Sequence, residues 1–252
     1  MSAHPPGQLD ICAFSRLRRA LIGLRHTPLH PQWLVLRGED QNRRAIARRL
    51  KGKVLDIGCG NRQMESLLGP ATAYVGLDYP TTHAKGYVGR PNLFGDGQCL
   101  PFRAESFDAV MALDVLEHLP SPDQCVREAA RVLRSGGQLI LKTPFLYPLH
   151  DMPHDFHRWT LSGLETLAQQ YGFVVTERRV FGVPGETAAA LAAIALAKMS
   201  LDSLQQRSPA TLLVPLLIAG IPFINLFGWL LARIFPVDDF MPLGYQMICT
   251  KE

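Results

Sequence analysis

The sequence lacks the patterns in which cysteine usually builds structure. Its 252 residues include five cysteines, with no Cys-x-x-Cys pair and no even framework. This spacing argues against a disulfide scaffold and structural zinc, and it favours a reducing compartment. The first residues also lack a charged segment followed by an apolar core, so no secretory leader is expected and the protein should stay inside the cell.

Acidic residues are scarce in the first part of the chain. Residues 1–53 contain 11 of the 26 lysines and arginines but only three of the 22 acids. Two stretches there, 14–25 and 39–50, place apolar residues at helical spacing between arginines, which predicts basic amphipathic helices. Residues 1–50 are therefore interpreted as a basic helical arm.

Beyond this arm, strand and helix patterns alternate with short connections. Strands are predicted at 53–57, 73–77, 107–113, 138–143 and 173–181, and helices near 62–68, 121–134 and 161–171. Such alternation is typical of right-handed βαβ units and a parallel sheet covered on both faces. We predict a doubly wound α/β fold whose core is 51–182 and whose final strand is 244–252.

An apolar insertion, 183–243, separates this core from its final strand. Residues 208–232 carry no charge and outnumber the about 20 residues that cross a bilayer as a helix. A return to the same sheet conflicts with a simple crossing, and Pro215, Gly220, Pro222 and Asn225 are expected to break the segment into pieces. We favour a helical hairpin in which 183–235 dips into one leaflet or roofs a pocket. The alternative is an apolar interface in a homodimer.

The stretch Val54-Leu55-Asp56-Ile57-Gly58-Cys59-Gly60 predicts a buried strand, a tight turn and the start of a helix. Gly58 and Gly60 lack the Cβ atoms that would keep a ligand from the backbone, and the helix would offer free N–H groups. Asp78 ends the next strand, where an open sheet places an acid for ribose hydroxyls, and Asp96 lies one strand further on. Gln63 stands where a dinucleotide motif has its third glycine, so an adenosine ligand without a pyrophosphate fits better.

These motifs resemble those of class I S-adenosylmethionine-dependent methyltransferases. Residues 54–60 match the first family motif, 75–78 the second acidic position, 106–119 the fourth motif and 131–139 the turn before the fifth strand. The resemblance implies S-adenosyl-L-methionine as the cofactor. It also implies that Asp56 orients the glycine turn. The remaining cofactor-binding residues that it implies are Gly58 and Gly60 at the methionine portion, Asp78 on the ribose, Asp96 near the adenine and Asp114 at the mouth of the site.

The segment 150–160 concentrates three histidines, two aspartates and an arginine just beyond the fifth strand. A histidine can deprotonate an acceptor hydroxyl, for which His154 and His157 are the candidates, and Arg158 can hold a phosphate or carboxylate of the substrate. The alternative is a loop whose polar side chains cap the following helix. No metal is expected, because the histidine spacings do not lie on a predicted helix face.

We therefore expect methyl transfer to a hydrophobic or lipid-linked small molecule by a cytoplasmic protein that is peripheral or monotopic at the inner membrane face. Contact with an anionic leaflet would involve the apolar insertion and the basic arm. One alternative is a nucleic-acid methyltransferase, but no aromatic-interleaved basic patch and no Asn/Asp-Pro-Pro-Tyr motif is present, so no nucleic acid is expected. The other alternative is a cofactor-binding scaffold without turnover.

Overall fold

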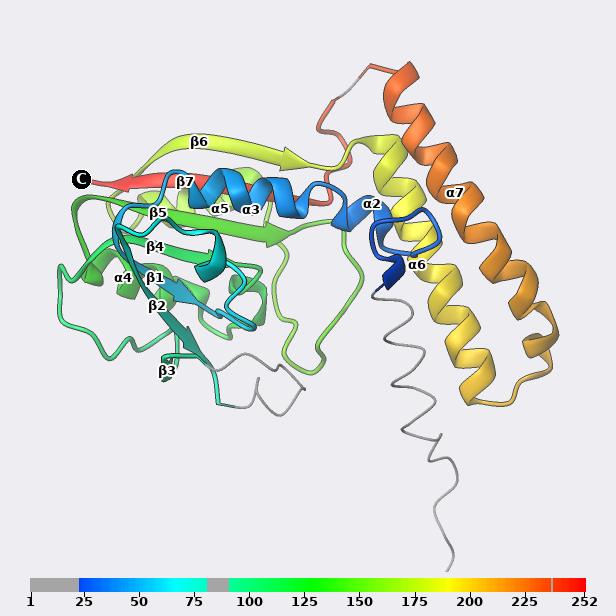
Figure 1. The fold of residues 1–252 in the computed structure, drawn as a ribbon, viewed down its shortest axis with the longest axis horizontal. Helices are drawn as coiled ribbons and strands as arrows, with labels where there is room; N and C mark the ends of the chain where they lie inside the picture. Colours follow the sequence, from blue (N-terminus) through cyan, green and yellow to red (C-terminus); the bar gives the residue numbers. More distant parts are fainter. Residues whose placement is uncertain (1–22, 81–90, 237) are drawn as a thin grey trace, which may run out of the picture. The chain divides into compact units, whose positions relative to one another are not determined.

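A computed structural model describes residues 23–80, 91–236 and 238–252 of the chain (Figure 1). The first of the two predicted basic helices, 14–25, therefore lies almost wholly outside the described residues. The second corresponds to helix α3 (Glu39–Ala47).

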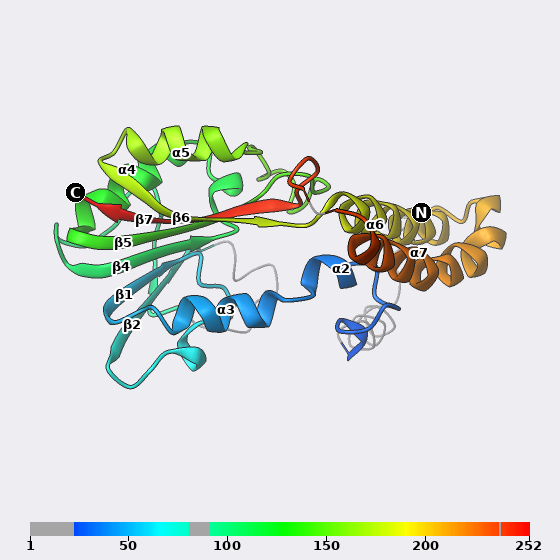
Figure 2. The same cartoon turned by 90° about the horizontal axis from the view of Figure 1, so that it is seen from above.

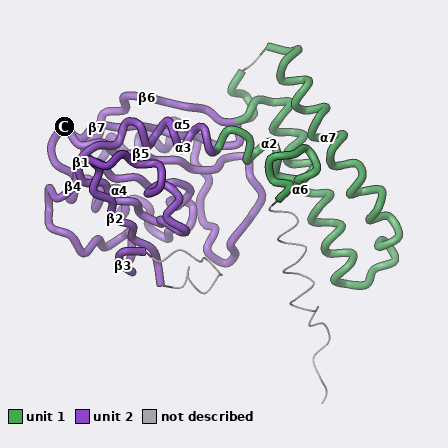
Figure 3. The backbone as a smooth tube through the Cα atoms, in the orientation of Figure 1, with its two compact units in different colours: residues 1–39, 182–241 green, residues 40–181, 242–252 purple. Residues whose placement is uncertain are grey.

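The chain divides into two compact units, each assembled from separate segments (Figure 3). Residues 1–39 and 182–241 form one, called here the helical unit. Residues 40–181 and 242–252 form the other, called the core unit. The chain therefore leaves the core unit once and returns to it for the last residues.

A seven-stranded sheet with the order β3-β2-β1-β4-β5-β7-β6 forms the centre of the core unit. Its strands are β1 (Gly52–Ile57), β2 (Thr72–Asp78), β3 (Leu93–Phe94), β4 (Phe107–Leu113), β5 (Leu133–Pro144), β6 (Phe173–Phe181) and β7 (Gly244–Lys251). Neighbouring strands from β3 to β5 are parallel, whereas β7 is antiparallel to both β5 and β6. The predicted doubly wound α/β fold, with its last strand at the end of the chain, is confirmed.

Helices cover both faces of this sheet (Figure 2). Val54 of β1 belongs to an apolar cluster with Ile46 of α3, and Leu55 belongs to a second cluster that includes residues of α4 (Pro122–Val132) and α5 (Leu161–Gln169). Successive residues of a strand point to opposite faces. The continuous burial from Val54 to Ile57 of β1 is therefore the pattern of a central strand that is covered on both sides.

One face of the second basic helix, α3, packs against the sheet. In α3, Ile46 and Ala47 are buried against the sheet. Arg43 forms an ion pair with Asp40 at 2.5 Å, and Arg49, just after the helix, pairs with Glu177 of β6. Two basic side chains of this segment thus form ion pairs within the core unit.

The helix predicted near 62–68 is wrong. Arg62 has a φ of 55°, and an α-helix needs consecutive residues in the right-handed region. Only the short 3-10 turn η1 (Glu65–Leu67) follows. The helix start that was expected to offer free N–H groups to a ligand is therefore replaced by a 3-10 turn.

The helical unit contains α2 (Trp33–Leu36), α6 (Pro184–Gln205), the 3-10 turn η4 (Pro209–Leu213) and α7 (Val214–Ile234). Helices α6 and α7 pack along each other as a hairpin (Figure 1). The expected breaks at Gly220, Pro222 and Asn225 are wrong, since α7 continues through all three. A proline removes one backbone hydrogen bond, and a long helix accommodates that loss by bending.

Small residues allow the two helices of the hairpin to approach closely. A Cβ atom added to Gly228 of α7 would lie 2.2 Å from the Cβ of Ala189 and 2.8 Å from the carbonyl oxygen of Gly185, both in α6. Asn225 is also buried, and its Nδ2 donates to the carbonyl oxygens of Pro28 and His30 at 2.7 and 3.0 Å. The inner side of α7 is therefore closely packed.

Candidate active site at the carboxyl edge of the sheet

The turn after β1 brings its backbone to the carboxyl edge of the sheet. Gly58 and Gly60 have φ values of 70° and 48°, a region that glycine adopts at little cost. The N–H groups of Gly58 and Cys59 donate to the carbonyl oxygen of Leu77 at 2.9 and 3.1 Å. A Cβ atom on Gly58 would lie 2.5 Å from Cγ2 of Val115. Position 58 therefore requires glycine for both its dihedral angles and its space.

Asp78 ends β2 directly beside this turn. Its Oδ2 accepts a hydrogen bond from the N–H of Gly60 at 3.0 Å, and its Oδ1 accepts one from the N–H of Tyr79 at 2.8 Å. Each carboxylate oxygen has a second lone pair. Asp78 is therefore held in place by the backbone and still has acceptor capacity for a diol.

Asp56 is buried within β1, behind the turn. The hydroxyl of Tyr74 donates to its Oδ2 at 2.7 Å. Burial raises the pKa of Asp56 to about 7, and the negative charge of Asp78 adds to this effect while the Tyr74 hydrogen bond opposes it. Burial also raises the pKa of the Cys59 thiol to about 12, so this cysteine is not a nucleophile at neutral pH.

Asp96 and Asp114 follow strands on either side of β1 and β2. The N–H of Gly95 donates to the carbonyl oxygen of Asp78 at 3.0 Å, which places Asp96 next to this acid. Asp114 has a φ of 57°, and its Oδ2 accepts a hydrogen bond from Nζ of Lys142 at 2.9 Å. The structure thus brings three of the predicted acids to one edge of the sheet.

These groups match the chemistry of S-adenosylmethionine. Asp78 offers an anionic acceptor to a ribose diol, and Gly58 provides a backbone surface that a side chain would block. Acids at the strand ends also favour a positively charged ligand. A phosphate would prefer the N-terminus of an α-helix, whereas the turn here leads into the short 3-10 turn η1.

Arg158 organises the loop that follows β5. Its guanidinium donates to Oδ1 and Oδ2 of Asp155 at 2.5 and 2.8 Å and to the carbonyl oxygens of Tyr147 and Pro148. The Arg158 hydrogen bonds lower the pKa of Asp155, which is therefore ionised at neutral pH. Arg158 positions this loop, and its contact with a substrate stays a prediction.

The two histidines predicted as bases lie in the same loop but in different surroundings. The side chain of His154 is exposed, and its carbonyl oxygen lies 2.6 Å from Nδ1 of His118. Nε2 of His157 is buried without a hydrogen-bond partner in the described part of the chain, and its ring centroid lies 5.8 Å from that of Trp159. The catalytic roles of His154 and His157 stay predictions.

A different group of titratable side chains lies close together, and we call it the Glu117 cluster: Glu117, His118 and His150. One ligand atom from each residue lies within 4.8 Å of the others. Glu117 and His118 belong to the 3-10 turn η3 (Leu116–His118) after β4, and His150 follows β5. The sequence did contain a feature that could have predicted this cluster: its residues come just after two predicted parallel strands. Parallel strands that are neighbours end at the same edge of a sheet, so residues that follow them lie close together.

Burial controls the charge in this cluster. It raises the pKa of Glu117, which is 0% exposed, and the charge of Asp114 adds to this effect. Burial also lowers the pKa of His118, and His150 lowers it further. His118 is therefore a neutral imidazole at pH 7, which can accept a proton or bind a cation.

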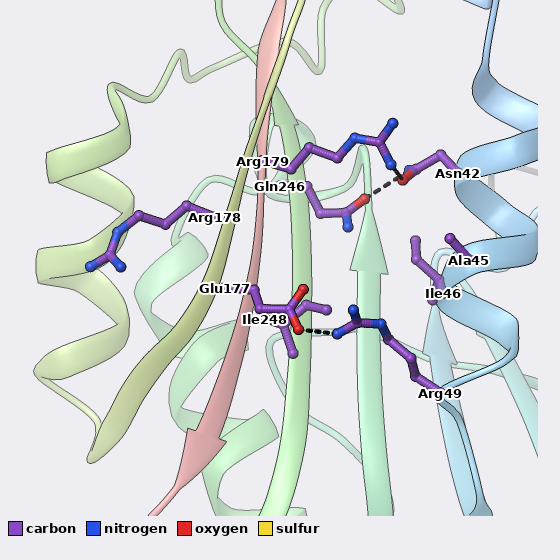
Figure 4. A pocket seen from close by; sticks show the side chains of 9 residues that line it. All are labelled: Asn42, Ala45, Ile46, Arg49, Glu177, Arg178, Arg179, Gln246 and Ile248. Carbon is purple, nitrogen blue, oxygen red and sulfur yellow. Dashed lines mark hydrogen bonds and ion pairs between the residues drawn. The ribbon is translucent and has the colours of Figure 1, made fainter.

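A separate pocket of about 160 Å³ lies between α3 and strands β6 and β7 (Figure 4). Nδ2 of Asn42 donates to Oε1 of Gln246, and Arg179 donates to Oδ1 of Asn42, both at 2.7 Å. Arg49 forms an ion pair with Glu177. These polar groups pair with one another under α3, away from the strand ends. The candidate site is therefore the carboxyl edge, not this pocket.

Comparison with known proteins identifies the same part of the chain. Residues 55–141 match a family model described as a methyltransferase domain. The chain is 33% identical over 128 residues to the ubiquinone biosynthesis O-methyltransferase of Aromatoleum aromaticum, covering 46% of this chain and 50% of that protein. It is 36% identical over 110 residues to the 27-O-demethylrifamycin SV methyltransferase of Amycolatopsis mediterranei, covering 38% and 40%. The chain spans half or less of the length of these relatives.

Solved structures show the same fold. A protein of an antibiotic biosynthesis pathway of Anabaena variabilis superposes with a TM-score of 0.56 at 18% identity, covering 84% of this chain and 97% of that one. The cyclase SpnF superposes with a TM-score of 0.52 at 16% identity, covering 84% and 80%. At these identities the likeness concerns the fold alone. The family match at 55–141 runs from β1 to β5 and includes the glycine turn and the acids at the strand ends.

Proposed function

Residues 55–141 form a class I S-adenosylmethionine-dependent methyltransferase domain, and from this premise we propose that the protein methylates a hydroxyl group of a small hydrophobic or lipid-linked molecule at a membrane surface. The observation that carries the proposal is that Val115, which touches the glycine turn, directly precedes the segment holding Glu117 and His118. The glycine turn, where the methyl donor is proposed to bind, therefore lies next to the Glu117 cluster, whose side chains can exchange protons. The names of the two relatives support a small acceptor.

When bound, S-adenosylmethionine supplies a methyl group on a positively charged sulfur. In the proposal, Asp78 holds the ribose hydroxyls, Asp96 contacts the adenine, and the turn at Gly58 and Gly60 receives the methionine portion. The Asp114 carboxylate at the mouth favours the positive charge. Methyl transfer is an in-line displacement without a covalent enzyme intermediate, so these residues act mainly by alignment, which can contribute about 7–11 kcal/mol.

The Glu117 cluster would act on the acceptor. The Nε2 atoms of His118 and His150 lie 3.8 and 4.0 Å from Oε1 of Glu117. Nδ1 of His150 lies 3.3 Å from Oδ2 of Asp155, and an ionised carboxylate in that position stabilises the imidazolium that forms when Nε2 takes a proton. We assign the uptake of the hydroxyl proton to His150. A general base of this kind contributes about 10²–10⁴-fold.

Two measurements on one set of variants test this assignment. Donor binding is measured by calorimetry, and transfer of a labelled methyl group is measured into membrane and small-molecule extracts. His150→Ala should bind the donor like the wild type and lose transfer by about 100-fold or more, whereas His26→Ala in the helical unit should retain both. Donor binding without labelled product from the wild type would favour a scaffold, and labelled nucleic acid would favour the other alternative.

The helical unit supports the membrane part of the proposal. The segments Pro184–Gln205 and Pro209–Ile234 are long and apolar enough to cross a membrane, yet only 28% and 17% of their apolar windows are buried. Core helices of soluble proteins are mostly buried, so these helices differ from that class. The exposed large apolar residues along η4 and α7 are Leu212, Leu213, Leu216, Ile218, Phe223, Leu226, Phe227, Leu230, Ile234 and Phe235. A surface of this size and kind is typical of an interaction site.

The path of the chain favours a hairpin that enters and leaves the lipid on the same side. The N–H of Leu243 donates to the carbonyl oxygen of Phe181 at 2.7 Å, so the chain leaves and re-enters the core unit at one place. At the end of α7, the guanidinium carbon of Arg233 lies 3.6 Å from the ring centroid of Trp229. Tryptophan and arginine are common at membrane interfaces. We therefore propose a monotopic attachment through α6 and α7.

The cytoplasmic leaflet is the proposed surface. Its anionic lipids attract lysine and arginine with about 1 kcal/mol per residue near the surface. Residues 1–53 hold 11 of them, of which Arg37, Arg43 and Arg49 form ion pairs with acids of the protein. Attachment should then depend on both apolar contact and charge. Binding to vesicles with anionic lipid should exceed binding to zwitterionic vesicles, and the difference should shrink at high salt.

Vesicle sedimentation with matched variants tests the attachment. The triple replacement of Leu216, Phe223 and Phe227 by Glu puts charge on the exposed surface of α7 and should release the folded protein from vesicles. Val174→Glu makes the same chemical change at an exposed position of β6 and should not. Continued sedimentation of the triple variant would contradict the hairpin proposal. Loss of a wild-type dimer, without any vesicle binding, would instead favour the apolar interface.

A further inference from the structure

We propose that the Glu117 cluster is a binding site for a divalent first-row transition metal ion, with Oε1 of Glu117 and Nε2 of His118 and His150 as its ligands. The sequence spacing did not predict a metal, because these residues are not arranged along one helix. The ends of β4 and β5 bring them together instead.

The carboxylate of Glu117 is the first reason for this proposal. Glu117 is 0% exposed, and neither of its side-chain oxygens has a hydrogen-bond partner in the described part of the chain. The ionised form of a buried carboxylate is costly unless it is paired, hydrogen-bonded or bound to a metal, so burial favours protonated Glu117 and a bound cation would stabilise its ionised form. Its oxygen faces two imidazole nitrogens at 3.8 and 4.0 Å, which is too far for a hydrogen bond to either.

The orientation of both imidazole rings is the second reason. Nδ1 of His118 lies 2.6 Å from the carbonyl oxygen of His154. Nδ1 of His150 lies 3.3 Å from both Oδ2 of Asp155 and the carbonyl oxygen of Pro148. In metal sites, the ring nitrogen that does not bind the metal usually donates to a carboxylate or a backbone carbonyl, which fixes the tautomer. Both rings have this arrangement, and it leaves both Nε2 atoms for a shared ligand.

The distances need only a small adjustment. Metal bonds of about 2.0–2.2 Å place neighbouring ligand atoms about 3–3.5 Å apart. The separations of 3.8 and 4.0 Å between Oε1 of Glu117 and the two Nε2 atoms exceed this by about 1 Å or less, and all three ligand atoms lie within 4.8 Å of one another. His150 lies in a loop, so modest side-chain rotations close the difference.

The donor set selects the class of metal. Two imidazole nitrogens and one carboxylate suit zinc and its first-row neighbours, whereas magnesium and calcium prefer oxygen ligands. Three protein ligands also leave a position open, as in catalytic zinc sites. Zinc is therefore the best match among the common ions.

A metal here would also affect the acceptor, and this second step rests on the proposed function. A hydroxyl oxygen in the open position has a lower pKa. It loses its proton to solvent and forms the new bond to the methyl carbon, while the bond from that carbon to the sulfur breaks and the demethylated donor leaves. In that case the ion would activate the hydroxyl, and His150 would act as its ligand instead of as the general base.

The metal site can be tested without donor or acceptor. The full chain is treated with a chelator and then titrated with Zn²⁺ by calorimetry and with Co²⁺ by visible absorption. We expect one equivalent to bind, with a cobalt spectrum of nitrogen and oxygen ligands and a rise in the melting temperature. Glu117→Gln and His150→Ala should each weaken Zn²⁺ binding by at least 100-fold.

His154→Ala is the matched control, because it removes a histidine of the same loop and keeps the carbonyl oxygen near His118. It should bind Zn²⁺ like the wild type. Circular dichroism and melting without metal show whether each variant is folded, and His150→Ala tests the site if Glu117→Gln does not fold. Absence of stoichiometric binding, equal affinity of the folded ligand variants and the wild type, or equal loss in His154→Ala would overturn the proposal. Stoichiometric binding without methyl transfer would leave the metal site standing and defeat only the proposed function.

Discussion

Replacement of Asp78 by alanine removes the carboxylate that anchors the proposed donor site. Its two oxygens accept hydrogen bonds from the N–H groups of Gly60 and Tyr79 at 3.0 and 2.8 Å. The variant therefore loses both the acceptor for a ribose diol and the group that holds the end of the glycine turn. Both losses should weaken binding of S-adenosylmethionine.

The size of the effect follows from one charged hydrogen bond. Such a bond contributes about 1.5–3 kcal/mol, so the dissociation constant should rise about 10- to 150-fold. Leaving the N–H of Gly60 without an acceptor also costs about 1–3 kcal/mol of stability. Asp78→Asn keeps an acceptor for one N–H group and removes the charge, so its folding should be closer to the wild type.

Calorimetric titration with S-adenosylmethionine measures the prediction, and a thermal melt without ligand shows that each variant is folded. Glu177→Ala is the control, because it removes an exposed acid of β6 that pairs with Arg49 on another part of the core unit. An unchanged dissociation constant for folded Asp78→Ala would refute the assignment of this acid. Equal weakening in Glu177→Ala would show that net charge, not position, controls binding.

Gly58→Ala should lower the free energy of unfolding by about 1–3 kcal/mol, because φ is 70° and the new Cβ would lie 2.5 Å from Cγ2 of Val115. Adding Val115→Ala should recover only the part of this loss that comes from the steric clash. A wild-type melting temperature for Gly58→Ala would contradict the prediction. Because burial raises the pKa of Asp56 to about 7, its protonated form stabilises the fold below about pH 4, and that contribution is lost as the pH rises to 7. Asp56→Asn should therefore gain stability relative to the wild type between pH 4 and pH 8 in urea unfolding, whereas a constant difference would argue against the shift. Gly228→Ala should destabilise the hairpin, since its new Cβ would lie 2.2 Å from the Cβ of Ala189. At Gly220 the nearest atom to a new Cβ is 3.8 Å away, so Gly220→Ala should stabilise the hairpin by up to about 1 kcal/mol. Equal shifts in the melting temperatures of the two variants would refute the close packing at Gly228.

Much of the core could be predicted from local sequence. The run from Val54 to Ile57 followed by Gly58 specifies a buried strand and a tight turn, because apolar periodicity and glycine act over a few residues. The positions of Asp78 and Asp114 then follow from the strands that precede them. The family resemblance predicted the methyltransferase domain from the same residues.

Local patterns failed where backbone geometry depends on neighbours. The residues after Gly60 have helix-forming composition, but Arg62 adopts a left-handed φ, and no sequence pattern signalled this. Pro222 was expected to end a helix, yet α7 continues through it while packed against α6. Propensity is a weak influence that tertiary packing overrides.

The sequence by itself determined most of the succession of strands and helices along the chain, the glycine turn and the acids at the strand ends. Only the tertiary structure decided which polar groups meet: Arg158 forms an ion pair with Asp155, and Nε2 of His150 lies 4.0 Å from Oε1 of Glu117, which is 33 positions earlier in the chain. The physical reason is that burial and hydrogen bonding depend on distances in space, which adjacent strands set and sequence spacing does not.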